Sequence, residues 1–208
     1  MNIGTKSDNI LFKVHEILGT GSLMLDEQIR LCAKNDRRAQ KFIYENFFGK
    51  MFAICTRYVN NHEDAMDILN RGFLKAYTNI EQFSFIGSFE GWLRKIMVNS
   101  ALDYIKSQKE YKKQIFLEQG THFADNIIIE NDALSKINLE DVYSLIQQLP
   151  PISRTVFNLY IIDGFTHKNI GEMMGISEGT SKWHVSFARA KLKDSLKKKQ
   201  VKLELAYG

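Results

Sequence analysis

The stretch that decides the fold spans residues 149–192 and reads LPPISRTVFNLYIIDGFTHKNIGEMMGISEGTSKWHVSFARAKL. Pro150 and Pro151 are the only prolines of the chain. Because proline fits the first turn of a helix but not its interior, this pair ends one helix and begins the next. Further along, Thr166 is a good N-cap, and it precedes a short helix that the pattern predicts over His167–Met174.

A tight turn and a long helix follow. Gly175 suits the end of the short helix, and Ser177 is the predicted N-cap of a helix running from Glu178 to about Lys198. A short helix, a glycine turn and a long helix in this order are typical of a helix-turn-helix motif, which places its second helix in a DNA major groove.

Charge is clustered along the chain. The net charge of +4 is too small to indicate nucleic-acid binding by itself, but Ser177 to Lys199 holds seven basic residues against two acidic ones. Residues 118–135 hold four acidic residues and no basic one. Local clusters decide where a nucleic acid is attracted. Cys32 and Cys55 lie in apolar helical patterns without metal-ligand spacing, so we expect buried, reduced thiols.

The hydrophobic periodicity is helical almost throughout, and no segment alternates as a strand does. With 44% hydrophobic residues in 208, the chain can form two cores. Asp26 is the predicted N-cap of the first clear helical pattern, and breaks fall at 35–36, 60–61 and 83–88. We therefore predict an all-α fold of two small helical domains joined by an acidic linker. The predicted divisions are an extension (1–24), a first domain (25–110), the linker (111–137), a second domain (138–199) and a tail (200–208).

The helix predicted from His62 to about Ile80 has an apolar face and a charged face. Residues 65, 69, 73, 76 and 80 share the face that should enter the core. On the other side, Ile68 and Leu74 lie among charged residues, which indicates either a second packing face or a docking surface for a protein. The candidate docking residues are Asp64, Asp67, Ile68, Arg71, Leu74 and Lys75.

The helix predicted after Ser88 is apolar on two faces, so a single stripe between them should be wet. Trp92 in this stripe can stack on a base, and Asn99 can hydrogen-bond base edges. The alternatives are a solvated face with a tryptophan at its rim, and loop phenylalanines that cover a core. The candidates for capture of single-stranded nucleic acid are Phe83, Phe85, Ser88, Trp92, Lys95, Asn99, Asp103 and Lys106.

The long helix from Glu178 has one inward face and an adjacent basic stripe. Its first turn, with Ser177 and Thr180, can bind phosphates through hydroxyl and backbone N–H groups. Lys182, Trp183 and Ser186 are placed to reach base edges. The full set of candidates for contact with duplex DNA is Thr166, Ser177, Thr180, Lys182, Trp183, Ser186, Phe187, Arg189 and Lys193.

Two motif blocks together resemble a bacterial RNA polymerase sigma factor of the extracytoplasmic-function (ECF) type. Residues 64–77 with 87–104 resemble sigma region 2, and residues 149–192 resemble region 4. The resemblance implies that the 64–77 helix docks on core RNA polymerase, that the loop and helix over 83–106 melt and hold the −10 promoter element, and that the helix from Glu178 reads the −35 element. It also implies an anti-sigma partner, commonly anchored in a membrane, and no cofactor or metal.

Three positions depart from the family pattern. Asn70-Arg71-Gly72 replaces a glutamine-acidic-apolar triplet, and a glycine there costs about 1 kcal/mol of helix propensity. Phe187 stands where an arginine is common, and Trp183-His184 replaces a small residue followed by a basic one.

The sequence thus predicts a cytoplasmic transcription initiation factor without catalytic chemistry. The resemblance implies core RNA polymerase and promoter DNA as its partners. A stand-alone helix-turn-helix regulator with a ligand- or partner-sensing N-terminal domain is the alternative. A nucleic-acid enzyme is disfavoured, because no carboxylate cluster, metal spacing or nucleophile arrangement is present. No apolar run approaches the roughly 18 residues of a membrane span.

Overall fold

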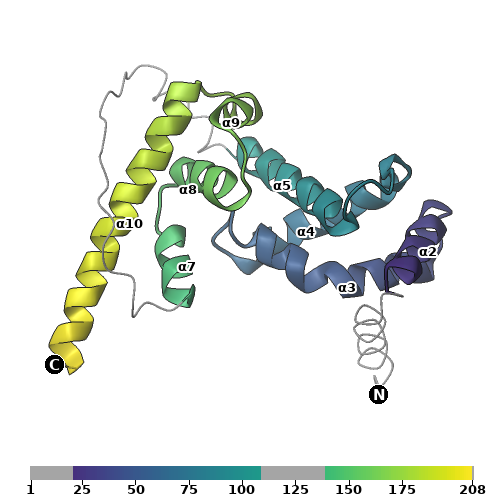
Figure 1. Cartoon of the computed structure of the whole chain (residues 1–208), viewed down its shortest axis with the longest axis horizontal. Helices are drawn as coiled ribbons and strands as arrows, with labels where there is room; N and C mark the ends of the chain where they lie inside the picture. The colour runs from purple at the N-terminus through teal and green to yellow at the C-terminus, as the bar shows by residue number, and fades with distance from the viewer. Residues whose placement is uncertain (1–20, 109–138, 208) are drawn as a thin grey trace. The chain divides into compact units, whose positions relative to one another are not determined.

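The computed structural model describes residues 21–108 and 139–207, and in these ranges it consists of helices and turns without a strand (Figure 1). The predicted all-α fold is confirmed. The linker predicted over 111–137 and nearly all of the N-terminal extension lie outside the described residues. Within the described ranges, one compact unit takes 21–56 and 61–101, and another takes 57–60, 102–108 and 139–207.

The first unit is built from α2 (Gly21–Ala33), α3 (Arg37–Cys55), α4 (His62–Thr78), the short 3₁₀ helix η1 (Ile80–Gln82) and α5 (Phe89–Ser107). The α5 helix runs across the boundary between the units. The predicted breaks are marked by N-caps: the Asp36 carboxylate accepts hydrogen bonds from the backbone N–H groups of Arg38 and Ala39, and Asn61 caps α4. The prediction that Asp26 caps the first helix is wrong, because α2 begins five residues earlier, at Gly21.

In the core of the first unit, the Met97 side chain of α5 packs directly against Gly72 of α4. A Cβ added to Gly72 would lie 2.2 Å from the Sδ of Met97, which is itself fully buried. A side chain at position 72 would therefore have to displace the Met97 thioether from its place in the core. Cys32 and Cys55 are buried free thiols, as the sequence predicts.

The second unit contains α7 (Leu139–Gln147), α8 (Pro151–Phe157), a π-helical turn η2 (Asn158–Ile162), α9 (His167–Met174) and the long α10 (Glu178–Tyr207). The α10 helix packs against α7, α8 and α9. Its core includes Ile146, Leu149, Phe157 and Ala188, with Val142 and Leu192 at the edge. Pro151 stands in the first turn of α8 as predicted, whereas α10 continues nine residues beyond the predicted end at Lys198.

Two buried arginines of the second unit, Arg154 and Arg57, have polar partners. The Arg154 guanidinium donates to the carbonyl oxygen and the side-chain oxygen of Gln147, at 3.0 and 2.9 Å. Burial lowers the pKa of Arg154. Nearby, the buried side chains of Arg57 and Asp163 form an ion pair at 3.3 Å. The bond from Arg154 to the Gln147 carbonyl satisfies one of the last carbonyl groups of α7, which have no partner within the helix.

Candidate nucleic-acid interface

The turn between α9 and α10 has the geometry of a rigid helix-turn-helix. The Thr166 hydroxyl accepts the N–H of Asn169 at 3.2 Å, and the Ser177 hydroxyl accepts the N–H of Thr180 at 2.9 Å. Gly175 adopts the left-handed conformation with φ of 69°. Both predicted N-caps and the glycine turn are confirmed.

Gly171 contributes to this turn in a way that the sequence analysis missed. A Cβ at this position would stand 2.8 Å from the backbone oxygen of Ile176, closer than side-chain carbons approach a carbonyl. The glycine therefore lets the α9 helix fold back against the start of α10. A glycine inside a predicted eight-residue helix is the signal that could have revealed this contact.

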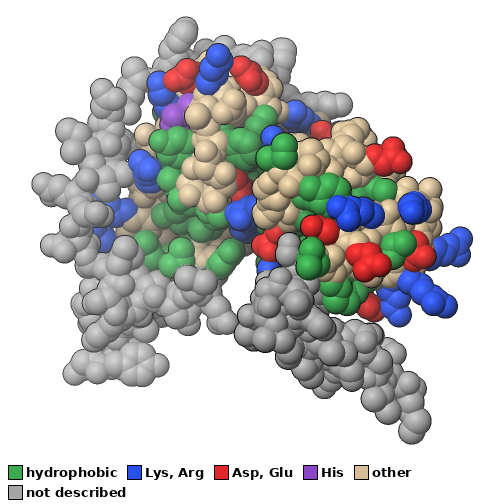
Figure 2. Space-filling view, turned by 45° about the vertical axis from the view of Figure 1, so that its right-hand side comes forward, with side chains coloured by type: hydrophobic (Ala, Val, Ile, Leu, Met, Phe, Trp, Pro, Cys, Tyr) green, Lys and Arg blue, Asp and Glu red, His purple; other side chains and the backbone are tan. Residues whose placement is uncertain are grey.

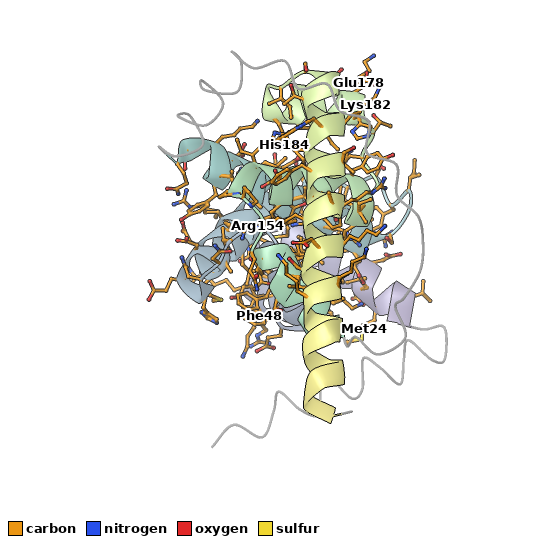
Figure 3. The ribbon with its side chains drawn as sticks, turned by 90° about the vertical axis from the view of Figure 1, so that its left-hand side faces the viewer. Met24, Phe48, Arg154, Glu178, Lys182 and His184 are labelled. Carbon is orange, nitrogen blue, oxygen red and sulfur yellow. The ribbon has the colours of Figure 1, made fainter. Side chains whose placement is uncertain are left out.

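The first turn of α10 carries an exposed ion pair. The Lys182 Nζ lies 2.7 Å from Glu178 Oε1, one helical turn away, and Figure 3 shows both residues at the same end of α10. The hydrogen bond from Lys182 lowers the pKa of the Glu178 carboxyl. Since both side chains are exposed, the pair is weak, and Lys182 can exchange the carboxylate for a phosphate at little cost.

Two aromatic side chains continue this surface along α10. The rings of Trp183 and Phe187 stack with centroids 5.2 Å apart and 21° between their planes. Both are half-buried, as is Ser186, and Arg189 further along is exposed. The two stacked rings form one apolar surface on α10. Both residues stand at positions where the sequence departs from the family pattern. The remaining candidates of this set are exposed at Thr166 and Ser177 and half-buried at Thr180 and Lys193.

His184, which the sequence marks only as a departure from the family pattern, belongs to the core of the second unit. It is 1% exposed, and its Nδ1 lies 2.9 Å from the Ser153 hydroxyl oxygen on α8. Burial lowers the pKa of His184 to about 4, so the ring is neutral near pH 7. This histidine joins α10 to α8 and is not part of the basic surface. Its place on the face shared with Val185 and Ala188 is a helical-period signal that could have identified it.

In the first unit, the loop over 83–88 rests on an aromatic cluster. Phe83 packs against Phe85, Phe89 and Trp92, with ring centroids between 5.1 and 5.7 Å apart. Phe83 is only 6% exposed, so the prediction that it contacts nucleic acid is corrected. Its ring is instead buried within the aromatic cluster. The Ser88 hydroxyl accepts the N–H of Gly91 at 3.0 Å, which makes it the N-cap of α5.

The predicted wet stripe of α5 is open to solvent. Lys95, Asn99 and Asp103 are exposed, and Trp92 and Lys106 are half-buried. Trp92 lies in the first turn of α5, at the end of the stripe next to the loop. Its ring also packs against that of Phe89, with the centroids 5.5 Å apart. The stripe therefore meets the aromatic cluster of the loop at Trp92.

The α4 surface differs from its prediction at one residue. Ile68 is 0% exposed, so it cannot contact a partner, and the prediction that it lies away from the core is wrong. It lies one helical turn before Gly72, which is also buried. Leu74 is 67% exposed, and Asp67 and Arg71 form an exposed ion pair at 2.7 Å. Asp64 is half-buried and Lys75 is exposed.

A half-buried aromatic stripe on α3 borders this surface and was missed in the sequence. Phe48 stacks on Phe52 at 5.7 Å and approaches Tyr44 at 5.4 Å, and the Tyr44 hydroxyl donates to Asn70 Oδ1 of α4 at 3.3 Å. Figure 3 marks Phe48. The spacing of four residues from 44 to 52 is the signal that could have found the stripe.

Charges of both signs are mixed on the molecular surface. Figure 2 shows basic side chains alternating with acidic and hydrophobic ones on the visible face of the described residues. No group of residues that could hold a metal ion occurs in 21–108 and 139–207. In the same part of the chain, every helix is too short or too polar to cross a membrane.

Comparison with known proteins matches both units to one family. Residues 43–111 match the model described as sigma-70 region 2, and residues 139–192 match the model described as sigma-70 region 4. The chain is 29% identical to the ECF RNA polymerase sigma-E factor of Haemophilus influenzae, over 78% of this chain and 90% of that protein. It is 28% identical to the ECF RNA polymerase sigma factor SigW of Bacillus subtilis, over 84% and 98%. Among solved structures it is similar to the sigma factor RpoE of Bartonella quintana, with a TM-score of 0.47 and 21% identity over 76% and 96% of the two chains.

Proposed function

Since the chain belongs to the ECF family of RNA polymerase sigma factors, we propose that it binds core RNA polymerase and gives it promoter specificity. Two separate surfaces support this proposal. A capped helix-turn-helix with a basic recognition helix suits duplex DNA, and an aromatic surface on the other unit suits unpaired bases. The observation that carries the proposal is the presence of both surfaces in the order of sigma regions 2 and 4.

The α5 stripe is proposed to hold the −10 element. Trp92 offers a half-exposed ring for stacking, and Asn99 and Lys95 are exposed beside it. Ser88, Asp103 and Lys106 border the same stripe. Melting a duplex needs a surface that stabilises unstacked bases, because each unstacked step costs a few kcal/mol. Trp92 is the residue best placed to recover part of that cost.

The α10 surface is proposed to bind the −35 element. The exposed start of α10, with the hydroxyls of Ser177 and Thr180, suits a phosphate, because the N-terminus of a helix attracts anions. Lys182, Trp183 and Ser186 are proposed to face base edges, and Arg189 and Lys193 the backbone as the helix leaves the groove. Phe187 is proposed to act with Trp183, on which it stacks.

The outer face of α4 is proposed to dock on core polymerase. With Ile68 in the core, its apolar contribution comes from Leu74 and from the aromatic stripe Tyr44, Phe48 and Phe52. Asp64, Asp67, Arg71 and Lys75 would form the polar rim. An exposed leucine among charges is typical of an anchor in a protein interface.

The docking proposal is tested with two matched leucines. Leu74→Asp should lower the affinity for core polymerase by at least about thirtyfold, the loss expected for an anchor residue. Leu23→Asp changes an equally exposed leucine on α2 and should leave the affinity within about twofold of wild type. Binding is measured by fluorescence anisotropy of labelled full-length protein. Equal affinities for wild type and Leu74→Asp would place the docking surface elsewhere.

Three further features follow as proposals from the family. The protein would act in the cytoplasm, carry out no catalysis of its own, and be held inactive by an anti-sigma partner. That partner would cover the same surfaces that polymerase and promoter use, so its binding and polymerase binding should be mutually exclusive.

A run-off transcription assay tests the function directly. Purified full-length protein is added to core RNA polymerase with a random promoter library, and transcripts are sequenced. We expect templates that share two conserved elements about two helical turns apart. A stand-alone helix-turn-helix regulator would instead bind duplex DNA tightly without polymerase and give no run-off product.

A further inference from the structure

The loop between η1 and α5 has an unusual backbone at its tip. Phe85 adopts a left-handed conformation with φ of 58°, and Gly87 has φ of 81°. Glycine takes this conformation freely, but a bulky aromatic residue is an outlier there. Such backbone strain persists only where the surroundings hold the residue in place.

The strained backbone turns one side chain fully outward. Ile86, between Phe85 and Gly87, is 85% exposed, the highest value for any large hydrophobic side chain in the described residues. A single exposed isoleucine needs no explanation by itself. This one, however, stands in a loop whose neighbouring Phe83 and Phe85 belong to a cluster of aromatic rings that includes Trp92.

Arg30 of α2 also contacts the loop. Its guanidinium carbon lies 5.1 Å from the centre of the Phe85 ring, a cation–π geometry, and Phe83 contacts the same ring at 5.1 Å. Phe85 is therefore packed between two neighbours and acts as a strut. Phe85 itself is 41% exposed, Ile86 is the most exposed apolar side chain of the loop, and the half-exposed ring beside the α5 stripe is that of Trp92.

We propose that Ile86 is a wedge that inserts between bases of the −10 element and that Arg30, acting through Phe85, positions it. The inference rests on the proposed function and deepens it. Proteins that unstack DNA insert apolar side chains such as isoleucine at the base step they open. The base released by the wedge would stack on Trp92, and the strained backbone keeps Ile86 directed outward before DNA arrives.

The test compares two templates of one promoter, selected from the random library by wild-type holoenzyme. One is fully duplex and the other has an unpaired −10 region. Ile86→Ala should slow open-complex formation on duplex by about tenfold, the effect of losing one stacking or wedging contact, and leave the unpaired template unchanged. Opening is followed by 2-aminopurine fluorescence in the −10 element. Ile86→Met, which keeps an apolar side chain of similar size, should open duplex close to the wild-type rate.

Arg30→Ala should show the same template dependence with a smaller loss, and Arg30→Lys should recover part of it. If Arg30 acted only by attracting phosphate, its removal would weaken binding to both templates and change the salt dependence by about one ion. Leu23→Ala, an exposed leucine on the same helix as Arg30, is the matched control and should match wild type on both templates. Wild-type opening of duplex by Ile86→Ala would overturn the wedge, and equal slowing on both templates would do the same. Failure of the wild-type holoenzyme to transcribe any library template would overturn the proposed function instead.

Discussion

The two units present their candidate DNA surfaces in opposite ways. In the second unit, the turn over 175–177 is short and capped at both helices, with glycine at the position of positive φ. In the first unit, the loop over 83–88 places a phenylalanine at positive φ and leaves an isoleucine in water. A rigid helix suits the fixed groove of a duplex, whereas an exposed apolar tip suits bases that must be separated. This difference fits the proposed division, in which the second unit recognises duplex DNA and the first unit opens the −10 element.

The largest expected effect concerns the rigidity of the second unit and its dependence on pH. Burial lowers the pKa of His184 to about 4 in the folded protein, against an ordinary value of 6.5. The unfolded chain therefore binds the proton first, so stability is complete above pH 6.5 and falls as the pH drops from 6.5 towards 4, by up to ~3 kcal/mol. The pKa of the half-buried His167 is also lowered, and its titration adds a loss in the same direction.

Urea unfolding of the full chain between pH 7 and pH 5 measures this dependence. With Trp92 replaced by phenylalanine, the fluorescence of Trp183 reports on the second unit alone. His184→Gln should flatten the part of the pH dependence that remains after His167→Gln. An unchanged slope after both substitutions would show that the pH dependence arises elsewhere.

The second effect tests the close turn. Gly171→Ala should destabilise the second unit by ~2 kcal/mol, because its Cβ meets the backbone oxygen of Ile176 at 2.8 Å, a contact that the rigid turn cannot relieve. Gly179→Ala is the matched control. Its Cβ would lie 3.6 Å from the Ser177 hydroxyl, an ordinary contact, and alanine favours the helix. Equal stabilities of the two variants in urea unfolding would show that the turn can relax and is not the rigid element described here.

These comparisons also show what sequence could and could not predict. The caps at Thr166, Ser177 and Ser88 are local, because each bond joins residues three positions apart, and the sequence predicts them. Ile68 and Phe83 were misplaced because their burial depends on segments distant in the chain or on the path of a loop. Helical periodicity alone cannot show that the Met97 side chain packs against Gly72 or that Phe83 packs against three other rings.

The third effect distinguishes base stacking on Trp92 in the first unit from duplex binding through Trp183 in the second. Trp92→Ala should reduce open-complex formation on duplex about tenfold, since stacking of one base on an aromatic ring contributes ~1–3 kcal/mol. Closed-complex formation, measured by filter binding at low temperature, should remain near wild type. Trp183→Ala should show the reverse pattern, with weaker closed complexes and altered −35 preference. The same pattern for both tryptophans would contradict the proposal that the first unit opens DNA and the second unit recognises duplex DNA.

The smallest effect concerns the basic side chains of α10. Arg189 is exposed two residues beyond Phe187 of the Trp183–Phe187 stack and is proposed to meet the phosphate backbone rather than a base. Arg189→Ala should weaken binding similarly for every −35 sequence and reduce the salt dependence by about one ion. Ser186→Ala should instead leave the salt dependence unchanged and change which −35 bases the library selects, because a hydroxyl carries no charge but can read a base edge. Titrations at several salt concentrations, combined with library sequencing, separate the two roles. A shift of −35 preference in Arg189→Ala, with an unchanged salt dependence, would show that Arg189 contacts bases in the groove and not the phosphate backbone.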